Sequence, residues 1–276
     1  MTGIDTGALA VLLAVSAGTA TAVMLITFVI GNTRGLHRIV DVAWGVAFAA
    51  VAVVSWFLSD GYGDDGRRAA VTLATVVWGL RLAVHIARRG RGHGEDPRYA
   101  RMLDRARGNR SLYALRTVYL LQGGLVWLVS LPVQVASLAP RPLDATAGAG
   151  LALWAAGVFF EATGDHQLAR FKADPANKGR IMDRGLWSWT RHPNYFGDFL
   201  VWWGLYLTAC VSWQSALLTL VSPLVMSGLL VFGSGKRLLE NHMAQRPGYA
   251  EYRARTSGFF PRPPRRTARP PRPGES

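Results

Sequence analysis

The run RHPNYFG at residues 191–197 places four polar side chains directly before an apolar stretch: Arg191, His192, Asn194 and Tyr195. Polar groups left unpaired near hydrocarbon cost several kcal/mol each, so we expect these side chains to hold something. Pro193 is typical of a first helical turn, and the N-terminus of a helix can bind a phosphate. The motif therefore predicts a clamp for a phosphorylated cofactor. Contact of Arg191 and His192 with lipid headgroups is the alternative.

Four ionisable residues lie within or at the edges of apolar runs: Asp41, Arg81, His85 and Glu161. Such residues are rare in membranes because inserting each costs roughly 2.5–3.5 kcal/mol, so they are functional candidates. Arg81 and His85 are four residues apart and share a helix face. We expect all four to line a cytoplasm-facing polar cavity that a lipophilic substrate enters from the bilayer. Structural ion pairs, such as Asp41 with Arg81, are the alternative.

Composition indicates which elements position these residues. Half of the residues are hydrophobic and 17% are charged, yet the formal net charge is +14, as in a membrane protein with basic loops. The arginines occur in short blocks between apolar runs, which argues against nucleic-acid binding, and the single Cys210 excludes a disulfide and a thiolate zinc cluster. We predict an all-α integral membrane fold with about seven transmembrane helices. Their apolar windows are 7–30, 39–59, 69–87, 117–139, 147–163, 195–212 and 215–235.

Lys and Arg residues set the expected orientation. Nearly all lie in segments on one side of the seven-span arrangement, whereas the other side holds Arg67, Arg68 and Arg141. The positive-inside rule then places the N-terminus outside and the C-terminus in the cytoplasm. We expect one membrane domain over residues 1–260 and a disordered, basic, Pro-rich tail over 261–276.

Familiar soluble-enzyme motifs do not occur. The sequence has no GxGxxG, GxxxxGK[ST], HExxH or GxSxG pattern, and its histidines lack metal-ligand spacing.

Trp187 and Trp189 are expected at the membrane interface, where an apolar ring with a polar N–H is favourable.

Five stretches of the sequence together carry a resemblance to a known family over residues from about 36 to 261. They are DVAWG at 41–45, WGLRLAVHIARRGRGHGEDPRY at 78–99, FEATGDHQLARFK at 160–172, GLWSWTRHPNYFGDFLVWWG at 185–204 and YAEYRARTSGFFP at 249–261. The chain resembles the bacterial membrane family DUF1295 in these stretches, although RHPxYxG alone also occurs in isoprenylcysteine carboxyl methyltransferases. A bacterial cytoplasmic membrane is therefore the expected location.

DUF1295 is similar to the steroid 5α-reductase C-terminal domain family, which implies a seven-helix membrane enzyme with NADPH in a cytosol-facing cavity. Steroid 5α-reductases use a Glu–Tyr pair to polarise the substrate ketone; Asp41 is a loose counterpart of the glutamate, and Trp78 stands at the tyrosine position. Tryptophan cannot supply a proton. The resemblance therefore supports the reaction class more strongly than it supports a steroid as the substrate. The cofactor residues it implies are Asp165, Lys172, Asn194, Asp198 and Tyr252, with Arg191, His192 and Tyr195 from the bacterial form of the motif.

The favoured hypothesis is an NADPH-dependent reductase of a carbon–carbon double bond in a lipophilic substrate, steroid, fatty-acyl or isoprenoid. His85 is the first candidate for the acid, because its unperturbed pKa lies at about 6.5. Arg81 through water and Tyr99 are the alternatives. Arg81, with Asp41, would orient His85 or bind the polar end of the substrate, beside Trp78 and Glu161. Lys172 and Arg170 would select NADPH through its 2′-phosphate.

Two other classes of protein stay open. In an S-adenosylmethionine-dependent membrane methyltransferase, RHPNYFG would hold the cofactor together with Asp198 and Glu240. Surplus arginine argues against it, because that cofactor carries no phosphate. A transporter or lipid-binding protein would need a polar path across the bilayer, and the outer halves of the predicted spans are apolar. Membrane lipids and a lipophilic small molecule are the expected partners.

Overall fold

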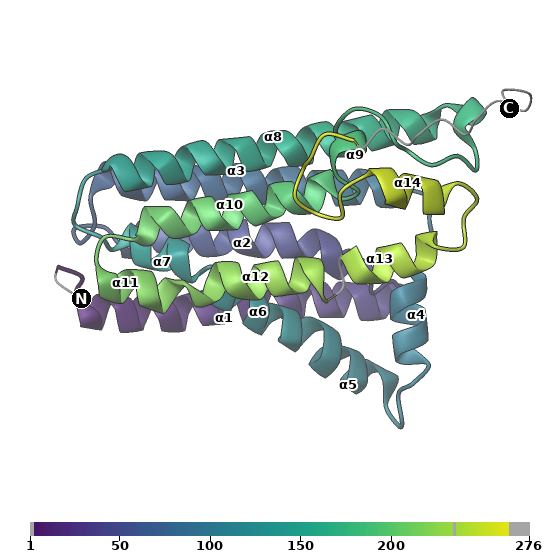
Figure 1. Cartoon of the computed structure of the whole chain (residues 1–276). Helices are drawn as coiled ribbons and strands as arrows, with labels where there is room; N and C mark the ends of the chain where they lie inside the picture. Colours follow the sequence, from purple (N-terminus) through teal and green to yellow (C-terminus); the bar gives the residue numbers. More distant parts are fainter. Residues whose placement is uncertain (1–2, 234–235, 265–276) are drawn as a thin grey trace, which may run out of the picture. The chain divides into compact units, whose positions relative to one another are not determined.

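The computed structural model describes residues 3–233 and 236–264, and it is helical as predicted (Figure 1). Its described part contains one isolated bridge, between Thr190 and Ser257. The contacts divide the chain into two compact units, treated separately below, so the expected single domain over 1–260 stays a prediction. Of the expected tail, residues 265–276 lie outside the described residues. Unit 1 comprises Met1–Trp154 and Trp202–Val225; unit 2 comprises Ala155–Val201 and Met226–Ser276.

Six described helices are long and apolar enough to cross a membrane, which makes this an integral membrane protein. The predicted sixth span corresponds to a helix of 17 residues, α10 (Pro193–Ala209), which is at the lower limit for a bilayer core. The six spans are Thr6–Arg34, Ile39–Leu58, Asp65–Gly90, Arg110–Val129, Ala145–Ala173 and Trp213–Val231.

Unit 1 is built around three long helices that run side by side (Figure 1): α1 (Thr6–Arg34), α2 (Ile39–Leu58) and α3 (Asp65–Gly90). Gly45 on α2 and Gly79 on α3 face each other so closely that a Cβ on either would meet the backbone oxygen of the other. The two helices therefore pack backbone to backbone.

The fourth predicted span, 117–139, was placed too far along the chain. The helical run starts after the cap Asn109 and passes through α5 (Arg110–Ala114), a π-helical turn (Leu115–Leu120) and α6 (Leu121–Val129). Pro132 lies at the start of the separate α7 (Leu131–Ser137), because proline lacks the N–H that would continue α6. The preceding loop carries α4 (Pro97–Leu103).

The last predicted span is divided by its proline. Ser212 and Ser215 form a capping box that starts α11 (Trp213–Thr219). Pro223 cannot donate to the carbonyl four residues earlier, so α11 ends at Thr219 and α12 (Val221–Val231) follows.

Helices α8 (Ala145–Ala173) and α10 approach through glycines within each unit. In unit 1 a Cβ at Gly150 would lie 2.6 Å from the Gly204 carbonyl oxygen, and in unit 2 one at Gly157 would lie 2.6 Å from that of Gly197. Unit 2 also contains α9 (Leu186–Trp189), α13 (Lys236–Met243) and α14 (Tyr249–Arg255).

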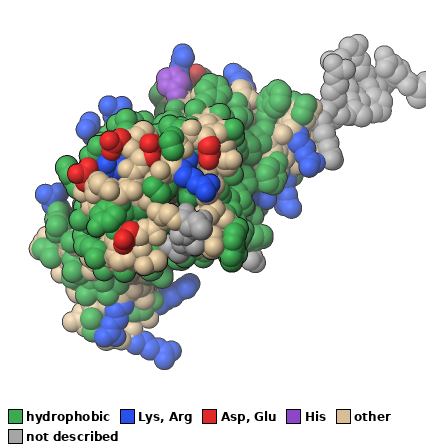
Figure 2. Space-filling view, turned by 90° about the vertical axis from the view of Figure 1, so that its left-hand side faces the viewer, with side chains coloured by type: hydrophobic (Ala, Val, Ile, Leu, Met, Phe, Trp, Pro, Cys, Tyr) green, Lys and Arg blue, Asp and Glu red, His purple; other side chains and the backbone are tan. Residues whose placement is uncertain are grey.

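Arg67 is almost fully buried at the start of α3. Its guanidinium donates to the carbonyls of Arg141 (2.9 Å), Pro142 (2.7 Å) and Thr208, and Asp144 lies 3.6 Å away. Figure 2 faces this end of the helices and shows acidic side chains gathered among hydrophobic ones. The planar fork of arginine thus ties three backbone segments of unit 1 together.

Changing Arg67 to Lys should lower the free energy of unfolding by about 1–2 kcal/mol. Lysine keeps the charge but cannot direct donors at three separate carbonyls. Equilibrium unfolding in detergent measures the change, with Arg141→Lys, at an exposed side chain, as control. Equal stability of the two variants would contradict the role given to Arg67.

Candidate functional site

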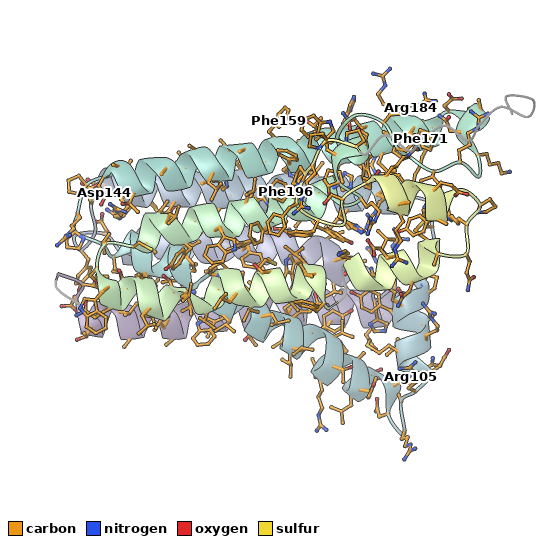
Figure 3. The ribbon with its side chains drawn as sticks, viewed as in Figure 1. Arg105, Asp144, Phe159, Phe171, Arg184 and Phe196 are labelled. Carbon is orange, nitrogen blue, oxygen red and sulfur yellow. The ribbon has the colours of Figure 1, made fainter. Side chains whose placement is uncertain are left out.

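A pocket of about 540 Å³ lies within unit 2, bounded by the end of α8, the following loop, α13 and α14. Phe171, Trp187, Tyr249 and Tyr252 give it aromatic walls, and Figure 3 labels Phe171 near the end of α8. Its volume is in the range of roughly 300–1,000 Å³ found for small-molecule and cofactor sites. The charged side chains that line it are Lys172, Asp174, Lys178, Arg180, Arg191 and Arg246, beside His192.

Local hydrogen bonds shape the loop that follows α8. Asp174 caps the short 3₁₀ turn Pro175–Asn177 by accepting from Ala176 N at 2.9 Å. The Asn177 amide donates back to the Phe171 carbonyl at 3.0 Å. Gly179 then takes φ +82°, a conformation that favours glycine. The loop is therefore a defined structure that directs the residues after α8 into the pocket wall.

Trp187 anchors the far side of this loop on α8. Its indole N–H donates to the Gly164 carbonyl at 2.9 Å, and Gln167 accepts from the neighbouring Leu186 N at 3.0 Å. Trp187 is 7% exposed and Trp189 is exposed; their expected place at the membrane interface stays a prediction. The N–H of a buried indole needs an acceptor, and the α8 backbone supplies it.

The C-terminal segment holds the RHPNYFG motif in place. Tyr252 donates its hydroxyl to the Trp187 carbonyl at 2.6 Å, and Thr190 donates to the Phe259 carbonyl at 2.7 Å. Arg191 donates its backbone N–H to the Ser257 carbonyl at 2.9 Å and its guanidinium to that of Thr256 at 2.6 Å. Two segments more than 60 residues apart along the chain thus form one wall.

Glu240 on α13 joins the two basic residues of the motif. Its Oε1 accepts from Arg191 Nε (3.0 Å) and Nη2 (2.8 Å), and His192 Nε2 lies 3.2 Å away. Burial opposes ionisation of Glu240, but the hydrogen bonds from His192 and Arg191 and the positive charge of Arg191 outweigh it and lower the Glu240 pKa to about 2. Arg191 therefore faces the pocket with its charge already compensated.

Burial lowers the pKa of His192, and Arg191 and Lys236 add to this against the opposing effect of Glu240. Its Nδ1 is buried without a hydrogen-bond partner among the described residues, so adding a proton there is unfavourable. Below the ordinary pKa of 6.5 the unfolded chain takes up a proton that the folded chain resists. The free energy of unfolding should therefore fall as pH drops through 6.5.

His192→Gln should remove this part of the pH dependence. The measurement is equilibrium unfolding in detergent above and below that pH, with His93→Gln, at an exposed histidine, as control. An unchanged slope in His192→Gln would contradict the assignment.

The predicted cofactor residues divide into two groups. Lys172, Arg191, His192 and Tyr252 line the pocket, and Glu240 binds two of them. The other five are absent from the described lining. Among these, Asn194 donates to Asp165 at 3.4 Å and Tyr195 stacks on His192 with ring centres 5.4 Å apart; Arg170 and Asp198 complete the group.

The predicted catalytic and substrate residues are distributed over both units. Asp41 in unit 1 accepts from the Tyr99 hydroxyl at 2.5 Å and from Arg98 at 2.9 Å. Arg81 and His85 lie on one helix, α3. Glu161 belongs to unit 2, where it is buried against Gly197. The shared cavity expected for these charges therefore stays a prediction.

Trp78 is fully buried in unit 1, in edge-on contact with Phe48 and Trp202 at 5.4 and 5.1 Å between ring centres. These contacts make it a core residue; its role at the substrate stays a prediction.

Sequence reasoning missed several pocket residues. Phe171 is far along the sequence from Arg246 and Tyr249, and the fold brings the three to one pocket. Lys178 and Arg180 were visible as cations in a turn-rich loop, but nothing in their spacing showed that they face an aromatic pocket.

Fold and pocket define the class: a helical integral membrane protein whose unit 2 forms a cation-rimmed aromatic pocket. The chain belongs to the family described as "Protein of unknown function (DUF1295)", which matches residues 27–256. It is 27% identical over 274 residues to "Uncharacterized protein C594.04c" of the yeast Schizosaccharomyces pombe, covering 87% of this chain and 78% of that protein. No solved structure matches the chain.

Proposed function

We propose that this protein is a membrane-embedded, NADPH-dependent reductase of a carbon–carbon double bond in a lipophilic substrate. The observation that carries the proposal is the pocket of unit 2, which combines aromatic walls with an excess of positive charge. Aromatic walls suit the flat rings of a dinucleotide, and Lys and Arg side chains suit its phosphates. The similarity of DUF1295 to the steroid 5α-reductase C-terminal domain family supports the same cofactor.

The excess of positive charge in the pocket favours NADPH over S-adenosylmethionine. Among the described lining residues, Asp174 is the one carboxylate, and it caps its own turn. Lys178, Arg180 and Arg246 remain once Glu240 compensates Arg191. A cofactor with a net positive charge would meet like charges here, whereas a polyanion is attracted.

Different residues around the pocket have different proposed roles. The Arg191–Glu240 pair fixes α13 against the motif, and Trp187 and Tyr252 keep the aromatic wall closed. When bound, NADPH supplies the hydride that reduces one alkene carbon. The protein supplies a proton to the other carbon or stabilises charge that develops on a conjugated carbonyl.

His85 is the proposed acid, and Arg81 and Asp41 orient it or bind the polar end of the substrate. Tyr99 hydrogen-bonds Asp41 and so fixes its carboxylate. Trp78 and Glu161 stay proposed substrate contacts, and the site is proposed to face the cytoplasm.

Isotope transfer tests the reaction class. Protein in lipid discs is incubated with total membrane lipid and NADPH deuterated at C4, and the lipids are analysed by mass spectrometry. A lipid that gains one deuterium and one proton across a former double bond supports the proposal. In a parallel arm, transfer of a labelled methyl group from S-adenosylmethionine would overturn it.

Matched variants connect the reaction to the pocket. Lys172→Ala removes a lining cation, and Arg170→Ala removes a cation that does not line the pocket. Deuterium transfer should fall in the first and persist in the second. Equal activity of the two would place the cofactor elsewhere.

A further inference from the structure

We infer that Lys178 and Arg180, with Arg246 facing the same pocket, bind the ribose 2′-phosphate of the cofactor and so make the protein select NADPH over NADH. This inference rests on the proposed function and names the residues that read the additional phosphate. The sequence-based hypothesis assigns that role to Lys172 and Arg170.

These three side chains are uncommitted cations. Lys178, Arg180 and Arg246 line the pocket and are exposed. With the residues that the structure describes, they form neither ion pairs nor side-chain hydrogen bonds. By contrast, Arg191 is compensated by Glu240 at 2.8 Å. Three free cations at one pocket rim are positioned for a dianion, the charge that a phosphomonoester approaches at neutral pH.

The backbone presents two of these cations from one turn. Gly179 lies between Lys178 and Arg180 with φ +82°, and Arg180 N donates to the Asn177 carbonyl at 3.0 Å. The turn is fixed from behind by Asp174, which accepts from Ala176 N and from the Asn177 amide. The two side chains are therefore held on the same loop and both line the pocket.

The exposure of the lining residues indicates which phosphate of the dinucleotide the three cations would bind: one that projects from the ligand or one at its centre. Trp187, Tyr249 and Tyr252 are each less than 10% exposed and form the deeper wall, which suits a ring. The pyrophosphate joins the two halves of a dinucleotide, whereas the 2′-phosphate projects from one ribose. Exposed cations at the rim reach a projecting group, so they match the 2′-phosphate.

The test compares ligands that differ in this phosphate. Calorimetric titration of the full-length protein in detergent uses NADPH against NADH, and adenosine 2′,5′-bisphosphate against adenosine 5′-monophosphate. The double variant Lys178→Ala, Arg180→Ala is compared with wild type. Arg184→Ala is the control, since it removes a cation from the same loop outside the pocket (Figure 3).

Wild type should bind NADPH more tightly than NADH. The double variant should lose about 10- to 100-fold in NADPH affinity, the loss expected for two charge-assisted contacts, while NADH affinity changes by less than about 3-fold. Arg184→Ala should bind as wild type does. Higher salt should weaken NADPH binding more in wild type than in the double variant.

Three results would overturn the inference. An equal loss of NADPH and NADH affinity would assign the cations to the pyrophosphate. Unchanged NADPH affinity in the double variant would remove them from the site. If wild type binds neither dinucleotide, the proposed function itself fails, and this outcome is distinct from the other two.

Discussion

Replacing Glu240 with alanine is expected to lower the free energy of unfolding by about 3–5 kcal/mol, because it leaves a buried arginine without its counter-charge. Arg191 is 9% exposed and donates two hydrogen bonds to the Glu240 carboxylate. His192 loses the same acceptor. Since both residues line the pocket, ligand binding should be lost together with stability.

Equilibrium unfolding in detergent measures this effect, and Glu251→Gln supplies the control. Glu251 is an exposed acid on α14 and should change stability by no more than about 0.5 kcal/mol. Glu240→Gln keeps the shape without the charge and should fall between wild type and Glu240→Ala. If Glu240→Ala were as stable as Glu251→Gln, the ion pair would not hold unit 2 together.

Gly197→Leu is expected to cost about 3 kcal/mol or to prevent folding, because overpacking against a rigid backbone cannot be relieved by a side-chain shift. A Cβ at Gly197 would lie 2.5 Å from the Gly157 carbonyl oxygen and 2.7 Å from Glu161 N. In unit 2 the start of α10 would have to leave α8, and the Asp165–Asn194 contact would break.

Gly124→Leu is the matched control. It makes the same change in a helix where a Cβ would meet nothing within 4 Å. The yield of folded, non-aggregated protein by size-exclusion chromatography and the midpoint of thermal unfolding are measured for both variants. Equal behaviour would mean that α8 and α10 do not pack through their glycines.

The helices were predictable because each depends on local apolar length, whereas several ends depend on single residues. Windows from composition and spacing found α1, α2 and α3. The prediction of the fourth span was displaced because the apolar run continues through α7, whereas α6 ends at Val129, before Pro132. In the last span Pro223 was visible in the sequence. The helix breaks at Thr219 because Pro223 lacks the N–H that would bond the carbonyl four residues earlier.

The candidate site was predictable as a motif but not as a pocket. Arg191 and His192 were predicted from the motif RHPNYFG, because polar residues directly before an apolar stretch are unusual. Their carboxylate partner, Glu240, lies 49 residues from Arg191; the sequence indicated Glu240 as a cofactor-binding residue but not as the partner of Arg191 and His192. Tyr252 was expected at the cofactor; its hydroxyl is occupied by the Trp187 carbonyl, so it also closes the wall.

Pairing of the charges near the apolar spans could not be derived. Asp41 was expected beside Arg81 or at a substrate, and its carboxylate accepts from Tyr99 and Arg98. These partners lie on the loop that carries α4, whose position depends on tertiary packing. Spacing along one helix, as for Arg81 and His85, predicts a shared face but not its neighbour.

The central claim is that the pocket of unit 2 binds a phosphorylated dinucleotide, and filling that pocket tests it most directly. Ala173 lines the pocket and is exposed, so Ala173→Trp should occupy the space without disturbing the core; Ala176→Trp is the control at an exposed site outside the lining. Calorimetric titration with NADPH should give micromolar binding to wild type and to Ala176→Trp, none to Ala173→Trp, and no response to S-adenosylmethionine. Equal NADPH binding by all three proteins, or a preference for S-adenosylmethionine, would contradict the claim.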